Sequence, residues 1–291
     1  MFIPRYCRAE KNFSRFFSAK TSNGVSYHLF YHVFIDFFKG YDKIEKAKRT
    51  SFSSSPSPRL RDEGGARYMN IIWHGQSCFQ IQTLRNKNGQ ISIIIDPFSE
   101  EIGLKAPKLE ADILLISHQH PDHNNTKAVS APTSGHPIFL IDGPGEYDVK
   151  NVIIQGIPSF HDNSQGKERG ENVIYTIEVE DLKICHLGDL GQKELTEEQL
   201  EKIGETDILM IPMGGTYTIS AKEAPKIMAQ IEPKITIPMH YALPKLKIKL
   251  DPLDKFLKTF GIKNLGTPMK KLLIKKKNIS PEEAKIVVLK P

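Results

Sequence analysis

From residue 69 onward, short apolar segments alternate with polar turns. Apolar runs of about four to eight residues, rich in β-branched side chains and bounded by Gly, Asn or Asp, are typical of strands. Residues 77–84 and 90–95 flank the sequence Asn-Lys-Asn-Gly at 86–89, which predicts a hairpin. The same pattern predicts further strands at residues 70–73, 113–116, 138–141, 152–155, 172–179, 182–185, 208–211 and 235–237.

Three helices are predicted in the second half of the chain. Residues 196–199 (Thr-Glu-Glu-Gln) and 220–223 (Ser-Ala-Lys-Glu) match the capping box, in which side chains satisfy the free backbone amides of a helix start. A third helix is predicted over residues 252–260. Early hairpins followed by alternating strands and helices indicate mixed sheets covered by helices. We therefore expect one domain over residues 69–291.

Residues 1–68 have a different character. Their aromatic side chains cluster without a sustained period, and a Ser/Pro/Arg-rich run at 51–61 is typical of a linker or of disorder. Because Met69 stands one residue before the first patterned strand, we expect residues 1–68 to be a poorly structured extension upstream of the native start. A targeting segment is the alternative, since the first twenty residues are basic and nearly free of acidic side chains.

Charge divides unevenly along the 291 residues. The net charge is +6, but residues 1–68 hold 13 Lys and Arg against 6 Asp and Glu, and residues 245–291 hold 13 against 4. Residues 69–244 are therefore net acidic, and we do not expect nucleic acid as a partner. Three scattered cysteines favour a reducing compartment, and no apolar run has the length of a bilayer span. We expect a cytoplasmic protein without a membrane segment.

The most informative segment is 117–123, Ser-His-Gln-His-Pro-Asp-His, directly after a predicted strand. In an extended segment alternate side chains share a face, so His118 and His120 can bind one cation. The proline that follows forces a turn, which lets Asp122 and His123 point to a second position nearby. A solvated polar loop is the alternative, but three of the ten histidines of the chain lie here. The cluster predicts a metal site.

This segment resembles the His-x-His-x-Asp-His signature of the metallo-β-lactamase fold superfamily of metal-dependent hydrolases. Further motifs resemble the branch that contains ascorbate-6-phosphate lactonase and similar uncharacterised Zn-dependent hydrolases. The resemblance covers about residues 69–245 and implies an α/β fold, a four-layer αββα sandwich of two mixed β-sheets flanked by helices. The motifs are Gly75-Gln76-Ser77-Cys78-Phe79, Asp96-Pro97-Phe98, Gly143-Pro144-Gly145-Glu146-Tyr147, His186-Leu187-Gly188-Asp189-Leu190-Gly191 and Gly214-Gly215-Thr216-Tyr217-Thr218.

The resemblance implies three further ligands, each after a predicted strand: His161, Asp189 and His240. His161 would join the first two histidines of the signature, and His240 would join the Asp-His pair that ends it. Asp189 would bridge both ions with its two oxygens. Imidazole and carboxylate ligands suit Zn, Mn or Fe, so we expect two divalent transition-metal ions, with Zn as the first choice.

The implied activity is hydrolysis by a hydroxide that bridges the two metal ions, with Asp122 as the catalytic group that orients it. The implied substrate is a small anionic metabolite such as a sugar-phosphate lactone. Thr216 and Tyr217 precede a predicted helix, and Tyr241 adjoins a predicted ligand, so all three are candidate substrate contacts. A packing role is equally consistent with their positions.

Two other functions are compatible with the same fold. A phosphodiesterase or nuclease shares the ligand pattern, but the acidic main body disfavours it, and residues 124–240 leave no room for an inserted β-CASP domain. A non-catalytic binding module that retains the fold is the second alternative, although it has no chemical reason to keep seven ligands. A monomer and a homo-oligomer are both consistent with the sequence.

Overall fold

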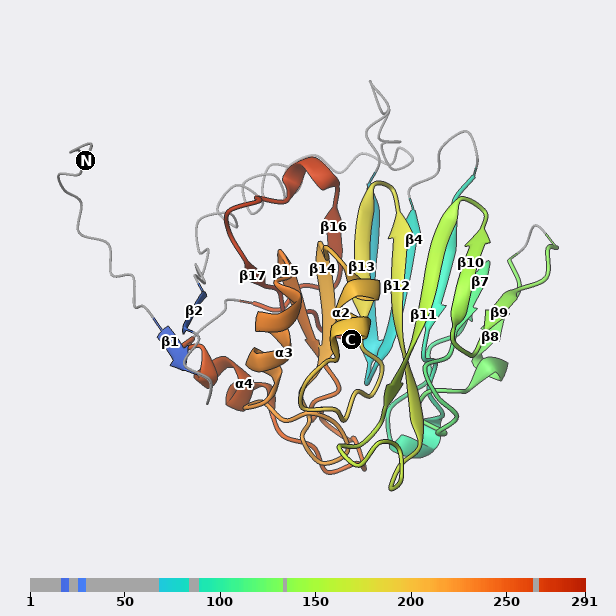
Figure 1. Cartoon of the computed structure of the whole chain (residues 1–291). Coiled ribbons are helices and arrows are strands. Elements are labelled where there is room, and N and C mark those ends of the chain that lie inside the picture. Colours follow the sequence, from blue (N-terminus) through green and yellow to red (C-terminus); the bar gives the residue numbers. More distant parts are fainter. Residues whose placement is uncertain (1–16, 21–25, 30–67, 84–88, 133–134, 264–266) are drawn as a thin grey trace, which may run out of the picture.

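The computed structural model describes residues 17–20, 26–29, 68–83, 89–132, 135–263 and 267–291. Among these residues, a six-stranded and a seven-stranded mixed sheet lie face to face (Figure 1), so the predicted α/β sandwich is confirmed. The strands β1 (Phe17–Lys20) and β2 (Ser26–Leu29) form an antiparallel pair. The expectations about the rest of residues 1–68 and about the turn at 86–88 lie outside the described residues.

The first sheet has six strands, in the order β16-β3-β4-β5-β7-β9. Strands β3, β4 and β5 pair antiparallel, whereas β5, β7 and β9 are parallel. Because side chains alternate between faces, Ile93 and Ile95 point into the space between the sheets while Ile94 packs on the outer face. The strands are β3 (Met69–Gly75), β4 (Cys78–Thr83), β5 (Ser92–Ile95), β7 (Ile113–Leu115), β9 (Phe139–Ile141) and β16 (Leu272–Ile274).

The second sheet has seven strands, in the order β10-β11-β12-β13-β14-β15-β17. Strands β10 to β13 form an antiparallel meander, and β13, β14, β15 and β17 are parallel. As a result, β11, β13 and β15 all end at the same edge of the sheet. The strands are β10 (Gly145–Val149), β11 (Val152–Phe160), β12 (Glu171–Val179), β13 (Leu182–His186), β14 (Ile208–Pro212), β15 (Ile235–Met239) and β17 (Lys285–Ile286).

Helices α2 (Glu197–Ile203) and α3 (Ala224–Ile231) lie over the outer face of the seven-stranded sheet (Figure 1). Helix α4 (Leu253–Thr259) lies next to α3, on the side of this sheet where β15 and β17 are found (Figure 1). The predicted capping box of α2 is confirmed, with Thr196 and Gln199 bonding to each other's backbone amides. Helix α3 begins later than its predicted start at 220. Pro225 has no amide hydrogen and is tolerated only in the first turn of a helix, which explains the delay.

The outer face of the six-stranded sheet is covered differently. Its buried apolar residues pack against Ile102, Leu109 and Val129, which come from short elements. These elements are the 3-10 turns η2 (Glu100–Ile102) and η3 (Thr126–Ala128) and the parallel pair β6 (Leu109–Glu110) and β8 (Val129–Ser130); a further 3-10 turn, η4 (Lys276–Asn278), lies near the end of the chain.

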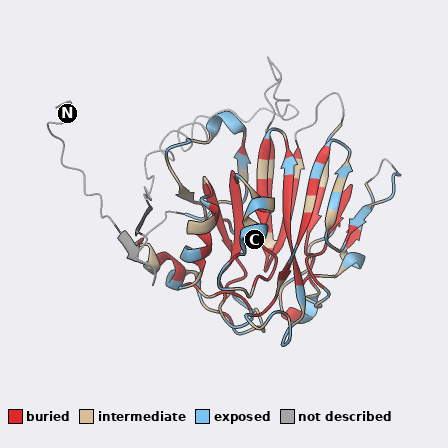
Figure 2. Cartoon of the chain, in the orientation of Figure 1, coloured by how far each residue is buried: buried red, intermediate tan, exposed pale blue. Residues whose placement is uncertain are grey.

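The main core lies between the two sheets, and Figure 2 shows buried residues along the strands of both. Each large apolar side chain buried there contributes on the order of 2 kcal/mol relative to exposure. The Tyr175 hydroxyl donates to the carbonyls of Ile116 and Ile141, which joins the sheets beside the edge that carries the predicted ligands. Among the described residues, no helix has the length and apolarity needed to cross a bilayer.

Candidate metal centre

The structure brings the seven predicted ligands together at one edge of the sandwich. Residues 118–123 follow β7 of the six-stranded sheet, and the other three ligands follow strands of the facing sheet. Because β11, β13 and β15 run in the same direction, the residues after them meet at the same edge. The side chains form two groups, His118, His120 and His161, and Asp122, His123, Asp189 and His240.

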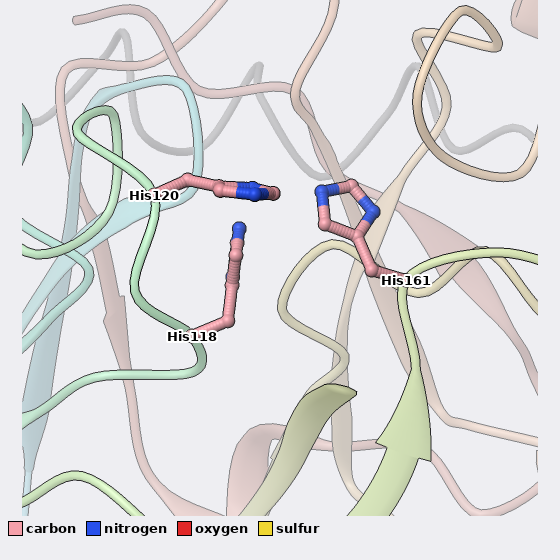
Figure 3. A group of neighbouring side chains, drawn as sticks. All are labelled: His118, His120 and His161. Carbon is pink, nitrogen blue, oxygen red and sulfur yellow. The ribbon is translucent and has the colours of Figure 1, made fainter. Parts of the chain in front are cut away.

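In the first group the three imidazole rings point toward one another (Figure 3). The ring centroid of His118 lies 4.6 Å from that of His120 and 4.7 Å from that of His161. The Ser117 hydroxyl lies 3.0 Å from His118 Nδ1, while His118 Nε2 is buried without a hydrogen-bond partner among the described residues. Burial and the neighbouring His123 lower the pKa of His118 to about 2, so this imidazole stays neutral with a free lone pair.

In the second group one donor atom of each residue lies within 4.8 Å of the others. Asp189 Oδ2 is 3.1 Å from His123 Nε2 and 3.2 Å from His240 Nε2. Asp122 Oδ2 is 3.5 Å from His123 Nε2 and 3.9 Å from His240 Nε2. Four ligands placed tetrahedrally at about 2.0–2.1 Å from a metal ion are separated by about 3.3 Å. The spacing in this group fits such an ion.

Asp189 connects the two groups through one oxygen. Its Oδ2 atom, which faces the second group, also lies 3.5 Å from Nε2 of His161 in the first group. Its other oxygen, Oδ1, accepts a hydrogen bond from the Ser77 hydroxyl at 3.1 Å. The sequence-based expectation had both oxygens bridging, whereas in the structure a single oxygen faces both groups.

The electrostatics of the second group also fit a cation. Burial alone would raise the pKa of Asp189, but His123 and His240 outweigh it and hold that pKa well below its usual range. Burial alone would lower the pKa of His240, but Asp189 and the hydrogen bond to Asp122 outweigh it and raise the pKa to about 9. The pKa of His123 is raised for the same reason. The two carboxylates thus favour positive charge within this group, and a bound divalent ion would supply that charge.

Asp96 supports the second group from behind. This buried carboxylate accepts the Ser117 amide at 2.7 Å through Oδ1, and the Ser117 hydroxyl at 2.7 Å and His123 Nδ1 at 3.0 Å through Oδ2. The proton of His123 is therefore held on Nδ1, and Nε2 is left to face the group. From the sequence, Asp96 was identified only as part of a motif and not as a site residue. A buried acid at a strand end, followed by proline, is the signal that indicates such a role.

The turn that carries Asp189 is held on both sides. Asn172 Oδ1 accepts the Asp189 amide at 2.9 Å, and His186 accepts the Gly188 amide at 3.1 Å on Nδ1. The other nitrogen of His186 donates to the Ser77 carbonyl at 2.9 Å. His186 therefore lies behind the ligands, where it positions two backbone segments that border the site.

Solvent reaches the site from the side of His120 and Asp122. His120 is partly exposed and the Asp122 side chain is 18% exposed, whereas the other five ligands are buried. Two loops that follow strands ending at this edge of the sandwich contact each other. The loop after β11 carries Arg169, and the loop after β14 carries Tyr217; the Arg169 guanidinium lies 4.1 Å from the Tyr217 ring centroid.

The three candidate substrate contacts differ in their surroundings. Tyr217 is 38% exposed. Thr216 donates its hydroxyl to the Lys249 carbonyl at 2.6 Å. Tyr241 is buried, stacks on Trp73 with ring centroids 5.0 Å apart, and points its hydroxyl to the Leu289 carbonyl at 3.5 Å. These contacts favour a packing role for Tyr241, whereas Thr216 and Tyr217 are both exposed.

Comparison with known proteins identifies the family. Residues 70–240 match the model of the beta-lactamase superfamily domain. The chain belongs to this superfamily. The crystal structure of a candidate Zn-dependent hydrolase of the metallo-β-lactamase superfamily from Thermotoga maritima is 37% identical, with a TM-score of 0.59, and the match covers 76% of this chain and 98% of that one.

Curated relatives carry the same activity in their names. A metal-dependent hydrolase from Thermoplasma volcanium is 32% identical over 209 residues, 64% of this chain and 88% of its own length. Another from Thermococcus onnurineus is 33% identical over 197 residues, 60% of this chain and 84% of its own length. The predicted family and activity class are confirmed: the chain is a metal-dependent hydrolase of the metallo-β-lactamase superfamily.

Proposed function

We propose that this hydrolase binds two divalent transition-metal ions, with Zn as the first choice of metal, and uses them to hydrolyse a small anionic metabolite. The first ion would be held by the three histidines of the first group and the second by Asp122, His123 and His240. The position of Asp189 Oδ2 carries the proposal, because this one oxygen lies within 3.5 Å of imidazole nitrogens from both groups.

Bound at these ligands, the ions would lower the pKa of a water molecule and polarise the substrate oxygen that takes up charge. Asp122 has the position to orient that water, because its carboxylate lies on the exposed side of the site. The pKa of Asp122 is low, since His123 and the hydrogen bonds to His123 and His240 outweigh the effect of burial. The carboxylate is therefore ionised and can accept the proton that the attacking water loses.

We propose a sugar-phosphate lactone as the substrate class. The sequence motifs of the lactonase-like branch support it, and so does Arg169. This guanidinium forms no ion pair with any residue that the structure describes and is held over the Tyr217 ring. The residue after it, Gly170, accepts the His161 amide, so Arg169 is close in the chain to a ligand-bearing segment and suited to a substrate phosphate.

Ring opening then needs no further reactant. The water oxygen bonds to the lactone carbonyl carbon, the ring carbon–oxygen bond breaks, and the products are a hydroxyl group and a carboxylic acid, which ionises to a carboxylate and releases its proton to solvent. The proton from the water can pass through the Asp122 carboxylate to the leaving ring oxygen.

The proposal is tested by metal analysis and a substrate panel. We expect close to two ions per chain, loss of activity with a chelator, and hydrolysis of phosphorylated lactones in preference to chromogenic phosphodiesters and thioesters. Arg169→Ala should raise KM for a phosphorylated lactone but not for its unphosphorylated analogue, whereas Lys167→Ala in the same loop should leave both unchanged. Activity on phosphodiesters alone would support the nuclease alternative instead.

A further inference from the structure

Gln76 lies in the turn between β3 and β4 and is completely buried. Its backbone has a left-handed conformation with φ of 49°. Its carbonyl accepts the Trp73 indole N–H at 2.8 Å and the His240 amide at 3.1 Å. The backbone of Gln76 is therefore fixed directly against a candidate metal ligand. A buried residue held in this uncommon conformation at a site indicates a positional requirement.

The side chain of Gln76 reaches the second group of ligands. Its Nε2 atom lies 3.4 Å from Asp122 Oδ2 and 3.4 Å from His240 Nε2. Its Oε1 atom is buried and has no hydrogen-bond partner among the residues that the structure describes. Buried polar atoms are nearly always paired in folded proteins, so a carboxamide that contacts ligand atoms while its oxygen is unpaired indicates a partner that the described residues do not supply.

The hydrogen-bonding capacity of His240 limits what the Gln76 amide can do. His240 Nε2 lies 3.2 Å from Asp189 Oδ2 and is the nitrogen that faces the second group. When that nitrogen binds a cation, its lone pair is used and it cannot accept an N–H from Gln76. A half-turn of the carboxamide places Oε1 where Nε2 stands, and an amide oxygen is a neutral metal ligand. The separations of 3.4 Å fall within the 3.1 to 3.9 Å that separate the carboxylate oxygens from the imidazole nitrogens of this group.

We propose that the side-chain oxygen of Gln76 is a further ligand of the second ion. This inference rests on the proposed two-metal function. The second ion then has three oxygen donors, from Gln76, Asp122 and Asp189, and two imidazole nitrogens. The first ion has three imidazoles and the oxygen of Asp189. Because oxygen donors suit harder ions, the second position takes Mn²⁺ more readily, relative to Zn²⁺, than the first position does.

The test compares metal binding of the full chain with that of two variants. Gln76→Leu keeps a similar size without a donor oxygen, and Gln76→Glu keeps an oxygen donor at the same reach. Zn²⁺ binding is followed by competition with a chromogenic chelator, and Mn²⁺ binding by the electron paramagnetic resonance signal of the free ion. We expect Gln76→Leu to lower the affinity for the second ion about 10- to 100-fold and to leave the affinity for the first ion unchanged. Gln76→Glu should retain the affinity for both ions.

A spectroscopic readout separates ligation from a merely structural role. In the chain loaded with Co²⁺, loss of one ligand from the second ion should intensify the visible d–d absorption in Gln76→Leu but not in Gln76→Glu. Gln80→Leu is the matched control, because Gln80 lies in the same hairpin and bonds to Ser92 and His74 instead. Its metal affinities and spectrum should equal those of the unmodified chain.

The outcomes distinguish this inference from the proposed function. If the unmodified chain binds fewer than two ions, the two-metal function and the role of Gln76 both fail. If it binds two ions and Gln76→Leu binds both with unchanged affinity and spectrum, only the role of Gln76 is refuted. If Gln76→Leu does not fold, Gln76→Asn provides the test, because its shorter amide should lower the affinity for the second ion and not for the first. Unchanged affinity for the second ion in Gln76→Asn would overturn the inference.

Discussion

The Ser77 hydroxyl donates a hydrogen bond to Asp189 Oδ1, and this bond joins the two sheets at the candidate metal centre. Ser77 lies between β3 and β4 of one sheet, and Asp189 follows β13 of the other. Both side chains are buried. With Oδ1 occupied by Ser77, the carboxylate turns Oδ2 toward His123 and His240. Ser77 is therefore a positioning residue for the proposed bridging oxygen.

Ser77→Ala should weaken metal binding without unfolding the chain. Removing the hydroxyl frees Oδ1 of Asp189, so the carboxylate can rotate and no longer presents one oxygen to both groups. Loss of such an outer hydrogen bond typically costs about 10- to 100-fold in metal affinity. Chelator competition measures this loss. Ser130→Ala, which removes a hydroxyl bonded to the Leu109 carbonyl away from the site, should leave the affinity unchanged.

Asp96→Asn should destabilise the chain and lower its affinity for the second ion. Asp96 accepts hydrogen bonds from the Ser117 amide, the Ser117 hydroxyl and His123 Nδ1, and it is fully buried. An asparagine at 96 places an NH₂ group against donors, which costs about 1–3 kcal/mol of unfolding free energy. Urea titration of the metal-free chain measures the change. The exposed Asp148→Asn should change stability by less than about 0.5 kcal/mol, and equal effects of the two variants would contradict the assignment.

The sequence predicts the interior strands well and the edge strands poorly. Strands β14 and β15 are buried at every position, so their continuous apolar runs are visible in the sequence. Strand β10 was not predicted, because Gly145–Val149 is an edge strand with exposed Glu146 and Asp148 and lacks an apolar run. The strands β16 and β17 were also missed, because they have only three and two residues and are shorter than the runs of about four to eight that predict a strand. Each is an edge strand of its sheet, on the side of the sandwich away from β9 and β10, and neither is fully buried along its length.

The candidate site shows a similar division. His118, His120, Asp122 and His123 are adjacent in the chain, so their spacing alone indicates a metal site. The supporting hydrogen bonds are invisible at this level because their partners are far apart in the sequence, as in the contact of Ser77 with Asp189. The sequence places His186 three residues before the candidate ligand Asp189. Only the folded chain shows which backbone groups it holds.

Asp122→Asn should abolish turnover while the fold is retained. The amide keeps the shape of the side chain, but it cannot accept a proton from the attacking water and carries no negative charge. Loss of a positioned general base lowers kcat by about 10²- to 10⁴-fold. Steady-state kinetics at saturating metal should show this fall in kcat. The exposed Asp142→Asn serves as control, and near-normal activity of Asp122→Asn on a confirmed substrate would refute the proton-accepting role.

Gly188 allows the Asp189 turn to pass close to two side chains, and replacing it tests how tightly the centre is packed. Its φ is +55°, and a Cβ at this position would lie 2.3 Å from Asn172 Oδ1 and 2.7 Å from Ser117 Cβ. Gly261 has a comparable φ of +67° but open space at the same point. Alanine at either position bears the cost of a left-handed backbone, whereas only Gly188→Ala adds the collision.

We therefore expect Gly188→Ala to lower the free energy of unfolding by about 1–3 kcal/mol more than Gly261→Ala does. The collision also displaces Asn172, whose Oδ1 accepts the Asp189 amide, so metal affinity should fall in Gly188→Ala alone. Equilibrium unfolding in urea and chelator competition measure the two effects separately. Equal losses of stability in the two variants, with unchanged metal affinity, would show that the turn can yield without moving Asp189.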